Sequence, residues 1–141
     1  DGFPTPNGRG RFVSCDLTDP DELPDRDYPM VLLTGRLLEH WHTGAITRRA
    51  SILDQLEPEA VAYLSPADLE EMDLSAGDSI HVKSRRGEIQ LRTRADAGVQ
   101  QGTVFIPFCF AEAAANLLTN AALDPDGKIA EVKFCAVRIS G

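Results

Sequence analysis

Residues 28–49 carry the pattern that decides the fold, and they read YPMVLLTGRLLEHWHTGAITRR. The apolar run from Tyr28 to Leu33 predicts a buried strand. It stops at Thr34-Gly35, where the glycine permits a sharp turn. The residues that follow, up to Ser51, are polar and show no clean period of 2 or 3.6. We therefore expect a long loop with short helical turns at most, and long ordered loops are often functional.

Short apolar segments separated by turns recur along the rest of the chain. We expect further strands at residues 61–64, 80–82, 89–93, 104–108 and 132–139. Gly87 lies at the bend of the predicted hairpin. Ser65 followed by Pro66 predicts the start of a two-turn helix that ends near Met72, and residues 111–118 predict a second helix. The pattern indicates a mainly β fold, a barrel or sandwich with accessory helices.

The composition is typical of one folded domain. The 141 residues are 43% hydrophobic and 26% charged, and 22 acids against 14 bases give a net charge of −8. Such a chain needs no disulfide or metal to fold, and no apolar run approaches the ~20 residues of a membrane span. Residues 1–27, rich in Pro, Gly and Asp, predict a connecting arm ahead of a barrel domain at residues 28–141. Because the chain opens with Asp1 rather than Met, we interpret it as a piece of a longer protein.

The basic residues are concentrated in two short stretches. They are Arg36, Arg48 and Arg49 in the first stretch, and Lys83, Arg85, Arg86, Arg92 and Arg94 in the second. The negative net charge argues against nucleic acid as a partner, but clustered arginines can hold a smaller anionic ligand. The alternative is that hairpin arginines such as Arg92 and Arg94 are solvated residues of a strand face.

Several common chemistries lack their residues. His40-Trp41-His42 could begin a zinc site, but no third ligand stands at a standard spacing, so we expect no protein-bound metal. No Gly-x-Ser-x-Gly elbow, P-loop or Gly-x-Gly-x-x-Gly motif is present. Cys109, in a phenylalanine-rich run, is typical of a buried core thiol. Three widely spaced cysteines form no disulfide framework and suit a reducing compartment, so we expect a cytoplasmic protein.

The segment from Thr34 to Arg49 nevertheless carries groups suited to an anion and a flat ring. A strand that ends in Thr34-Gly35-Arg36 presents backbone N–H groups, a hydroxyl and a guanidinium, which can hold a phosphate or pyrophosphate. Trp41 offers a stacking surface, and its two histidine neighbours offer hydrogen-bond donors. This combination predicts a nucleotide-like ligand; the alternative is that the segment only builds the fold.

These residues also resemble a known family. Residues 34–44, followed by Thr47-Arg48-Arg49, resemble the signature in the C-terminal domain of molybdopterin oxidoreductases, the group of formate dehydrogenases and periplasmic-type nitrate reductases. The resemblance continues, in the family's order, through Ser65-Pro66-Ala67-Asp68, Gly77-Asp78, Ser84-Arg85-Arg86-Gly87, residues 107–110, Asn116-Leu117-Leu118-Thr119, Asp124-Pro125 and Lys133. It implies a six-stranded double-psi β-barrel, aspartate-decarboxylase-like, that closes over molybdopterin guanine dinucleotide, through which Mo or W is bound.

The resemblance implies a set of cofactor contacts. By position, they are Thr34, Gly35, Arg36, His40, Trp41, His42, Thr43, Gly44, Thr47, Arg48, Asn116 and Lys133. Arg36 can make bidentate hydrogen bonds to phosphate oxygens, and Lys133 supplies a point charge. Asn116 can both donate to and accept from a purine or pterin edge. Phe108 corresponds to an aromatic residue that lies near substrate in the nitrate reductase branch of the family. The resemblance places no catalytic residue and no metal ligand in this chain.

Residues 111–120, with Asp124-Pro125 and Lys128-Ile129, resemble formate dehydrogenase catalytic (alpha) subunits more than nitrate reductases. Cys109 departs from the formate branch, which usually has His there. The implied parent enzyme oxidises formate to carbon dioxide and two electrons, with a 4Fe-4S cluster outside this chain. Its implied partners are the remaining domains of the subunit and electron-transfer subunits, without nucleic acid or a membrane span. The alternatives are a nitrate reductase domain and a β-barrel interaction module that binds no cofactor.

Overall fold

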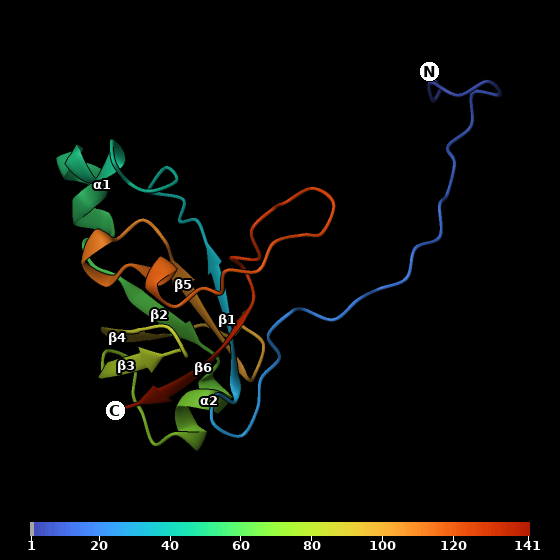
Figure 1. Cartoon of the computed structure of the whole chain (residues 1–141). Coiled ribbons are helices and arrows are strands. Elements are labelled where there is room, and N and C mark those ends of the chain that lie inside the picture. The colour runs from blue at the N-terminus through green and yellow to red at the C-terminus, as the bar shows by residue number, and fades with distance from the viewer. Residues whose placement is uncertain (1) are drawn as a thin grey trace.

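The computed structural model describes residues 2–141 and shows six strands that close into a barrel (Figure 1). The strands are β1 (Met30–Gly35), β2 (Val61–Leu64), β3 (Ser79–Lys83), β4 (Glu88–Ala95), β5 (Thr103–Pro107) and β6 (Cys135–Ser140). Around the barrel their order is β1-β5-β2-β4-β3-β6. The expected mainly β, six-stranded barrel is confirmed.

Two of the neighbouring strand pairs in the barrel are parallel, and an antiparallel pair separates them. β1 runs parallel to β5, and β2 runs parallel to β4. The other neighbours in the barrel are antiparallel. In the first parallel pair Gly35 lies opposite Pro107, so both strands end at the same rim of the barrel. The loops that follow β1 and β5 therefore begin side by side, although about 70 residues separate them in the sequence.

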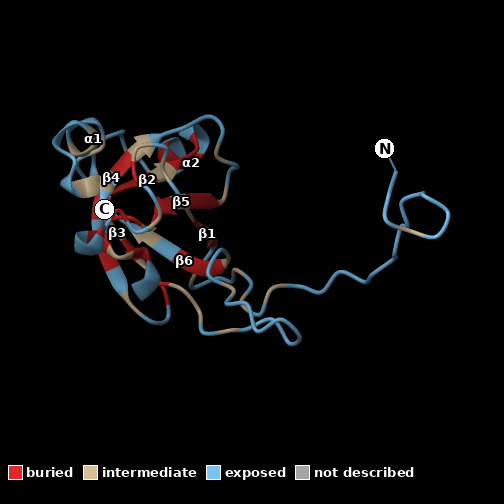
Figure 2. Ribbon diagram, turned by 90° about the horizontal axis from the view of Figure 1, so that it is seen from above, coloured by how far each residue is buried: buried red, intermediate tan, exposed pale blue. Residues whose placement is uncertain are grey.

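The barrel interior is filled by alternating strand residues. Leu32, Ile80, Val82, Val104 and Ile106 are all 0% exposed, and Figure 2 shows the buried residues concentrated along the strands. Alternation of inward apolar and outward polar residues is what a strand with one face on the core requires. The hairpin of β3 and β4 shows it clearly, and Gly87 lies in its bend as expected.

The helices are short. They are η1 (Thr47–Arg49), α1 (Ser51–Leu56), α2 (Pro66–Glu71), η2 (Ala111–Ala113) and η3 (Ala115–Leu117), where η denotes 3-10 helix. α2 begins as predicted, because the Ser65 hydroxyl oxygen accepts the Asp68 backbone N–H at 3.1 Å. The prediction of one helix over residues 111–118 is wrong. Ala114 has an extended ψ of 102°, and it separates η2 from η3.

Strand boundaries also differ from the expectation, by one or two residues at the ends of β1, β3, β4 and β5 and by three residues at the start of β6. β1 begins at Met30 rather than Tyr28 and continues to Gly35, and β6 begins at Cys135 rather than Val132. The carbonyl of Val132 accepts the Thr34 hydroxyl at 2.7 Å, and the carbonyl of Phe134 accepts the Asn120 amide at 3.1 Å. These side chains use backbone groups that a strand ladder would need.

Residues 2–29 contain no helix or strand and lead away from the barrel (Figure 1). Phe12 and Leu17 in this arm are 102% and 97% exposed. Farther along, Glu22 and Asp25 contact the barrel. Within residues 2–141, no helix is both long and apolar enough to cross a membrane.

Candidate functional site

The rim where β1 and β5 end carries most of the predicted contact residues. We call this rim the β1–β5 end, residues 36–50 its first loop and residues 108–118 its second loop. The second loop begins with a hydrogen bond from the Phe108 N–H to the Gly35 carbonyl, at 3.1 Å. The barrel therefore places both loops at one site before any side chain is considered.

Two glycines are required by the close packing at this site. Gly44 is buried with a φ of +72°, and a Cβ there would lie 2.8 Å from the Cys109 carbonyl oxygen and 2.8 Å from Cγ of Arg48. A Cβ on Gly35 would overlap the ring of Phe105. Any larger residue at Gly44 would push the two loops apart.

His40 is a structural support in this conformation. It is 0% exposed, its Nε2 lies 2.8 Å from the carbonyl oxygen of Glu57, and its ring meets Phe110 edge-on at 5.6 Å. A carbonyl only accepts, so Nε2 carries the proton. Nδ1 has no hydrogen-bond partner among the described residues. The predicted contact from this ring to a ligand would require the first loop to open.

Arg48, another predicted contact, is engaged by the protein itself. Its guanidinium donates to Glu112 at 2.7 Å, to Asp54 at 3.3 Å and to the Pro58 carbonyl at 3.3 Å, and it lies over the ring of Phe110 at 4.7 Å. The hydrogen bond to Glu112 raises the pKa of Arg48 despite partial desolvation. Arg48 thus joins the first loop to α1 and to the second loop.

Two predicted hydroxyl contacts are also used internally. The Thr47 hydroxyl oxygen accepts the Trp41 backbone N–H at 3.0 Å, which fixes the turn of the first loop. The Thr34 hydroxyl donates to Val132, and Thr34 is 4% exposed. The contact with Val132 places the neighbouring Lys133 in a segment that lies against the end of β1.

Other predicted contact residues are exposed, and their side chains are free to contact a ligand. Within residues 2–141, the side chains of Arg36, Asn116 and Lys133 make no hydrogen bond or ion pair. Trp41 is 69% exposed, and Thr43 is exposed beside it. Arg36, Trp41 and Thr43 all belong to the first loop, and Lys133 follows Val132, which contacts the end of β1. Asn116 lies in η3, at the far end of the second loop.

His42 has a backbone conformation that is uncommon for a residue other than glycine. Its φ is +49°, in the left-handed region, and its ring lies edge-on to Trp41 with 4.4 Å between ring centroids. Such a conformation costs a non-glycine residue on the order of 1 kcal/mol. Strain of this kind is found preferentially at functional sites.

The predicted set of cofactor contacts omits Arg49, which the sequence analysis placed only in the first basic stretch. Arg49 is exposed, and in the described part of the chain its side chain has no acidic partner, whereas the adjacent Arg48 has two. The shorter of the two Arg48 contacts could not be read from neighbouring residues, because Glu112 is 64 residues away in the sequence. Phe108, the predicted substrate-proximal residue, is half-buried and packs against the core.

The second basic stretch is neutralised within the chain. Its ion pairs are Lys83 with Glu88, Arg85 with Asp25, Arg86 with Glu22, Arg92 with Glu59, and Arg94 with Glu57. The possibility of an anionic ligand there is therefore not supported. Arg92 fits best the alternative interpretation, that of a solvated residue on a strand face, since its side chain is 59% exposed. Cys109 is 2% exposed, as expected for a core thiol, and burial raises its pKa to about 11.

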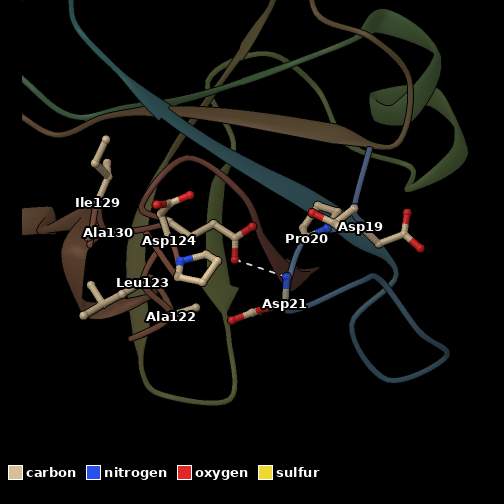
Figure 3. A pocket seen from close by; sticks show the side chains of 11 residues that line it. Asp19, Pro20, Asp21, Ala122, Leu123, Asp124, Ile129 and Ala130 are labelled. Carbon is tan, nitrogen blue, oxygen red and sulfur yellow. Dashed lines mark hydrogen bonds between the residues drawn. The ribbon is translucent and has the colours of Figure 1, made fainter. Parts of the chain in front are cut away.

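A cavity of about 420 Å³ lies between residues 18–21 of the arm and residues 122–131 (Figure 3). Its lining includes the carboxylates of Asp19, Asp21, Asp124 and Glu131 and no basic residue. This lining does not suit an anionic ligand. In the part of the chain that the structure describes, no group of three His, Cys, Asp or Glu side chains is placed to hold a metal ion.

Comparisons with known proteins show the family to which the chain belongs. Residues 30–136 match the protein family described as "Molydopterin dinucleotide binding domain". The chain is 45% identical to the F420-dependent formate dehydrogenase subunit alpha of Methanocaldococcus jannaschii, over 99% of this chain and 21% of that protein. It is 43% identical to the F420-dependent formate dehydrogenase 1 subunit alpha of Methanococcus maripaludis, over 96% of this chain and 20% of that protein. The chain thus spans about a fifth of the length of these relatives.

The fold has a counterpart among solved structures. Acetylene hydratase from Pelobacter acetylenicus superimposes with a TM-score of 0.71 at 21% sequence identity. The match covers 81% of this chain and 18% of that one. At this identity the likeness concerns the fold alone.

Proposed function

Because the chain belongs to the molydopterin dinucleotide binding domain family, we propose that its β1–β5 end binds the pyrophosphate and pterin of a molybdopterin guanine dinucleotide. The observation that carries the proposal is that three cations without an ion-pair partner in residues 2–141, Arg36, Arg49 and Lys133, lie at the rim that also presents Trp41. The arginines of the β3–β4 hairpin are paired with acids of the chain. Cations of an acidic protein that have no such partner favour the binding of an external anion.

The donor set fits such a ligand. Arg36 and Arg49 can each direct two N–H groups at phosphate oxygens, and Lys133 adds a point charge. Trp41, with His42 and Thr43 beside it, offers a flat face and polar groups to a fused heterocycle. Asn116 can bond a purine or pterin edge. Other residues of the predicted set, Thr34, Gly35, His40, Gly44, Thr47 and Arg48, would act by holding the loops in shape.

The parent enzyme that we propose is a formate dehydrogenase. The relatives matched over nearly the whole chain carry that name, and they are called F420-dependent. In that enzyme formate would lose a proton and two electrons and become carbon dioxide. The bound cofactor would supply the sulfurs that hold Mo or W, while this chain would bind and orient it. We further propose a 4Fe-4S cluster, electron-transfer subunits and a cytoplasmic location for the parent.

The test is Arg36→Ala in the full-length subunit that carries this domain. Loss of a charge-assisted bidentate contact should lower the affinity for the cofactor by about tenfold or more. We expect less molybdenum or tungsten and less guanine nucleotide per purified subunit, and proportionally less formate oxidation. Arg92→Ala is the matched control, because Arg92 is an exposed arginine on β4 that bonds the Gly77 carbonyl.

Normal metal and nucleotide content in the Arg36 variant, with normal activity, would contradict the proposed cofactor contact. The interaction-module alternative predicts that result, because such a module needs no cofactor. A fully loaded parent enzyme that reduces nitrate and leaves formate unchanged would contradict the proposed substrate while preserving the cofactor site.

A further inference from the structure

Two arginines at the bend of the β3–β4 hairpin converge on one carboxylate of the arm. Arg86 donates from its two Nη atoms to the two carboxylate oxygens of Glu22, at 2.5 and 2.8 Å. Nη1 of Arg85 lies 3.5 Å from the same carboxylate. The Glu22 side chain is only 14% exposed, so solvent screens this pairing weakly. A fork of two parallel N–H donors is the geometry that proteins use to recognise carboxylates.

A backbone amide completes the set of donors. The Ala136 N–H donates to Oε1 of Glu22 at 2.8 Å, and Ala136 is 0% exposed. β6 pairs with β3 only at residues 138–140, because β3 ends at Lys83. On the other side of β6, Ala136 lies opposite Val31 of β1. Val31 donates its amide to the Gly102 carbonyl, toward β5 and away from Ala136. Without the Glu22 carboxylate, the Ala136 amide would be a buried donor with no acceptor.

Contacts on either side of Glu22 hold residues 21–28, which we call the strap, against the barrel. The Asp21 N–H donates to Glu131 at 3.2 Å, and Asp25 pairs with Arg85. The Tyr28 ring lies 4.5 Å from the guanidinium carbon of Arg85. The bidentate pair at the centre is also the most buried of these contacts.

Arg86 connects the strap to the second loop of the proposed cofactor site. Its Nε donates to the Leu118 carbonyl at 3.0 Å while its Nη atoms hold Glu22. The neighbouring Gly87 packs so closely on this loop that a Cβ there would lie 2.8 Å from the Leu117 carbonyl oxygen. One guanidinium therefore joins the arm to the end of the second loop.

We propose that Arg85, Arg86 and the Ala136 amide form a carboxylate-binding site in the barrel wall, whose resident ligand is Glu22. This site fixes where the arm leaves the barrel, and it accepts a free small carboxylate when the Glu22 side chain is removed. None of the groups that bind the Glu22 carboxylate belongs to the proposed set of cofactor contacts, so the proposal does not depend on the proposed cofactor.

The test is amide hydrogen exchange at Ala136, measured by NMR on the 141-residue chain. Glu22→Ala should speed this exchange by about tenfold or more, because the amide loses a charged acceptor. Added sodium acetate should slow it again by severalfold, and sodium chloride at equal ionic strength should not. Trypsin should also cleave faster after Arg26, inside the strap, with no change after Arg11, which lies outside it.

Asp16→Asn is the matched control, because Asp16 is an exposed acid of the arm that makes no hydrogen bond or ion pair within residues 2–141. It should leave the Ala136 exchange rate unchanged. Glu22→Gln covers the case in which the alanine variant does not fold, because its amide oxygen can still accept from Ala136. We expect this variant to be intermediate in exchange rate. Wild-type exchange at Ala136 in a folded Glu22 variant, or equal effects of acetate and chloride, would overturn the proposal.

Discussion

The β1–β5 end and the bend of the β3–β4 hairpin both carry adjacent arginines, yet they differ in what surrounds them. At the hairpin, Arg85 and Arg86 are saturated by acids of the arm, Glu22 and Asp25. In the first loop, Arg36 and Arg49 have no acidic partner among residues 2–141. A basic stretch in a sequence therefore does not locate an anion site by itself. The proposed site rests instead on unpaired cations that share one rim of the barrel with Trp41.

Arg86→Ala should have the largest effect on stability. The substitution removes a bidentate pair and a bond to the Leu118 carbonyl, and it leaves Glu22 largely buried without its main partner. We expect the free energy of unfolding to fall by about 2–3 kcal/mol, measured by urea denaturation. Arg86→Lys should restore only part of this loss, because an ammonium cannot bond both carboxylate oxygens in the same fork. An unchanged unfolding midpoint would show that Arg86, like the unpaired arginines of the first loop, does not stabilise the fold.

Arg48→Ala should come next. Arg48 belongs to the first loop but behaves like the hairpin arginines, since it bonds Asp54 and Glu112. Those carboxylates are 40% and 51% exposed, so solvent weakens the pairs, and we expect a loss of about 1–2 kcal/mol. Arg49→Ala is the matched control and should change the free energy of unfolding by about 0.5 kcal/mol or less. Equal losses in the two variants would show that the pairing of Arg48 has no energetic consequence.

Acid should weaken the strap. The hydrogen bond from Arg86, aided by the Ala136 amide and opposed by desolvation, lowers the pKa of Glu22 below its usual value of 4.5. A lowered carboxyl pKa stabilises the fold above pH 4.5, and that stabilisation is lost as the pH falls through the lower folded value. Unfolding free energies measured from pH 6 to pH 3 should therefore fall less steeply for Glu22→Gln than for the wild type. Parallel curves would contradict this.

Arg36→Ala should have the smallest effect on stability, within about 0.5 kcal/mol, because no described group depends on its guanidinium. The same substitution should strongly reduce cofactor content in the parent subunit, as proposed above. Thermal unfolding of the 141-residue chain checks the first statement. A marked fall in melting temperature would mean that Arg36, like Arg86, is used by the fold.

Local patterns predicted the elements whose stability is local. The strand at residues 61–64 and the Ser65 cap of α2 were predicted at their observed positions, because alternation and capping depend on neighbouring residues. The helix at residues 111–118 was not, since the burial of Ala113 and Ala115 is decided by the barrel beneath them. The sequence analysis did not predict helix α1, and no side-chain cap marks the start of this helix.

The candidate site could likewise be predicted only in part, because some of its contacts join residues far apart in the sequence. The cluster in the first loop was visible in the sequence, but the partners of its residues were not. Arg48 is bonded to Glu112, and Arg86 to Glu22, each 64 residues away in the sequence. Which arginine stays available therefore depends on contacts that only the closed barrel creates.

Trp41 is the chain's single tryptophan, and it stands exposed in the first loop. The molecule thus carries one indole fluorophore, and that indole lies where the ligand is proposed to bind. Emission from Trp41 should shift to shorter wavelength or be quenched when a heterocycle covers the indole. It should stay constant when the strap is released on the barrel wall. A fluorimeter could then follow the two proposed sites separately in one unlabelled sample.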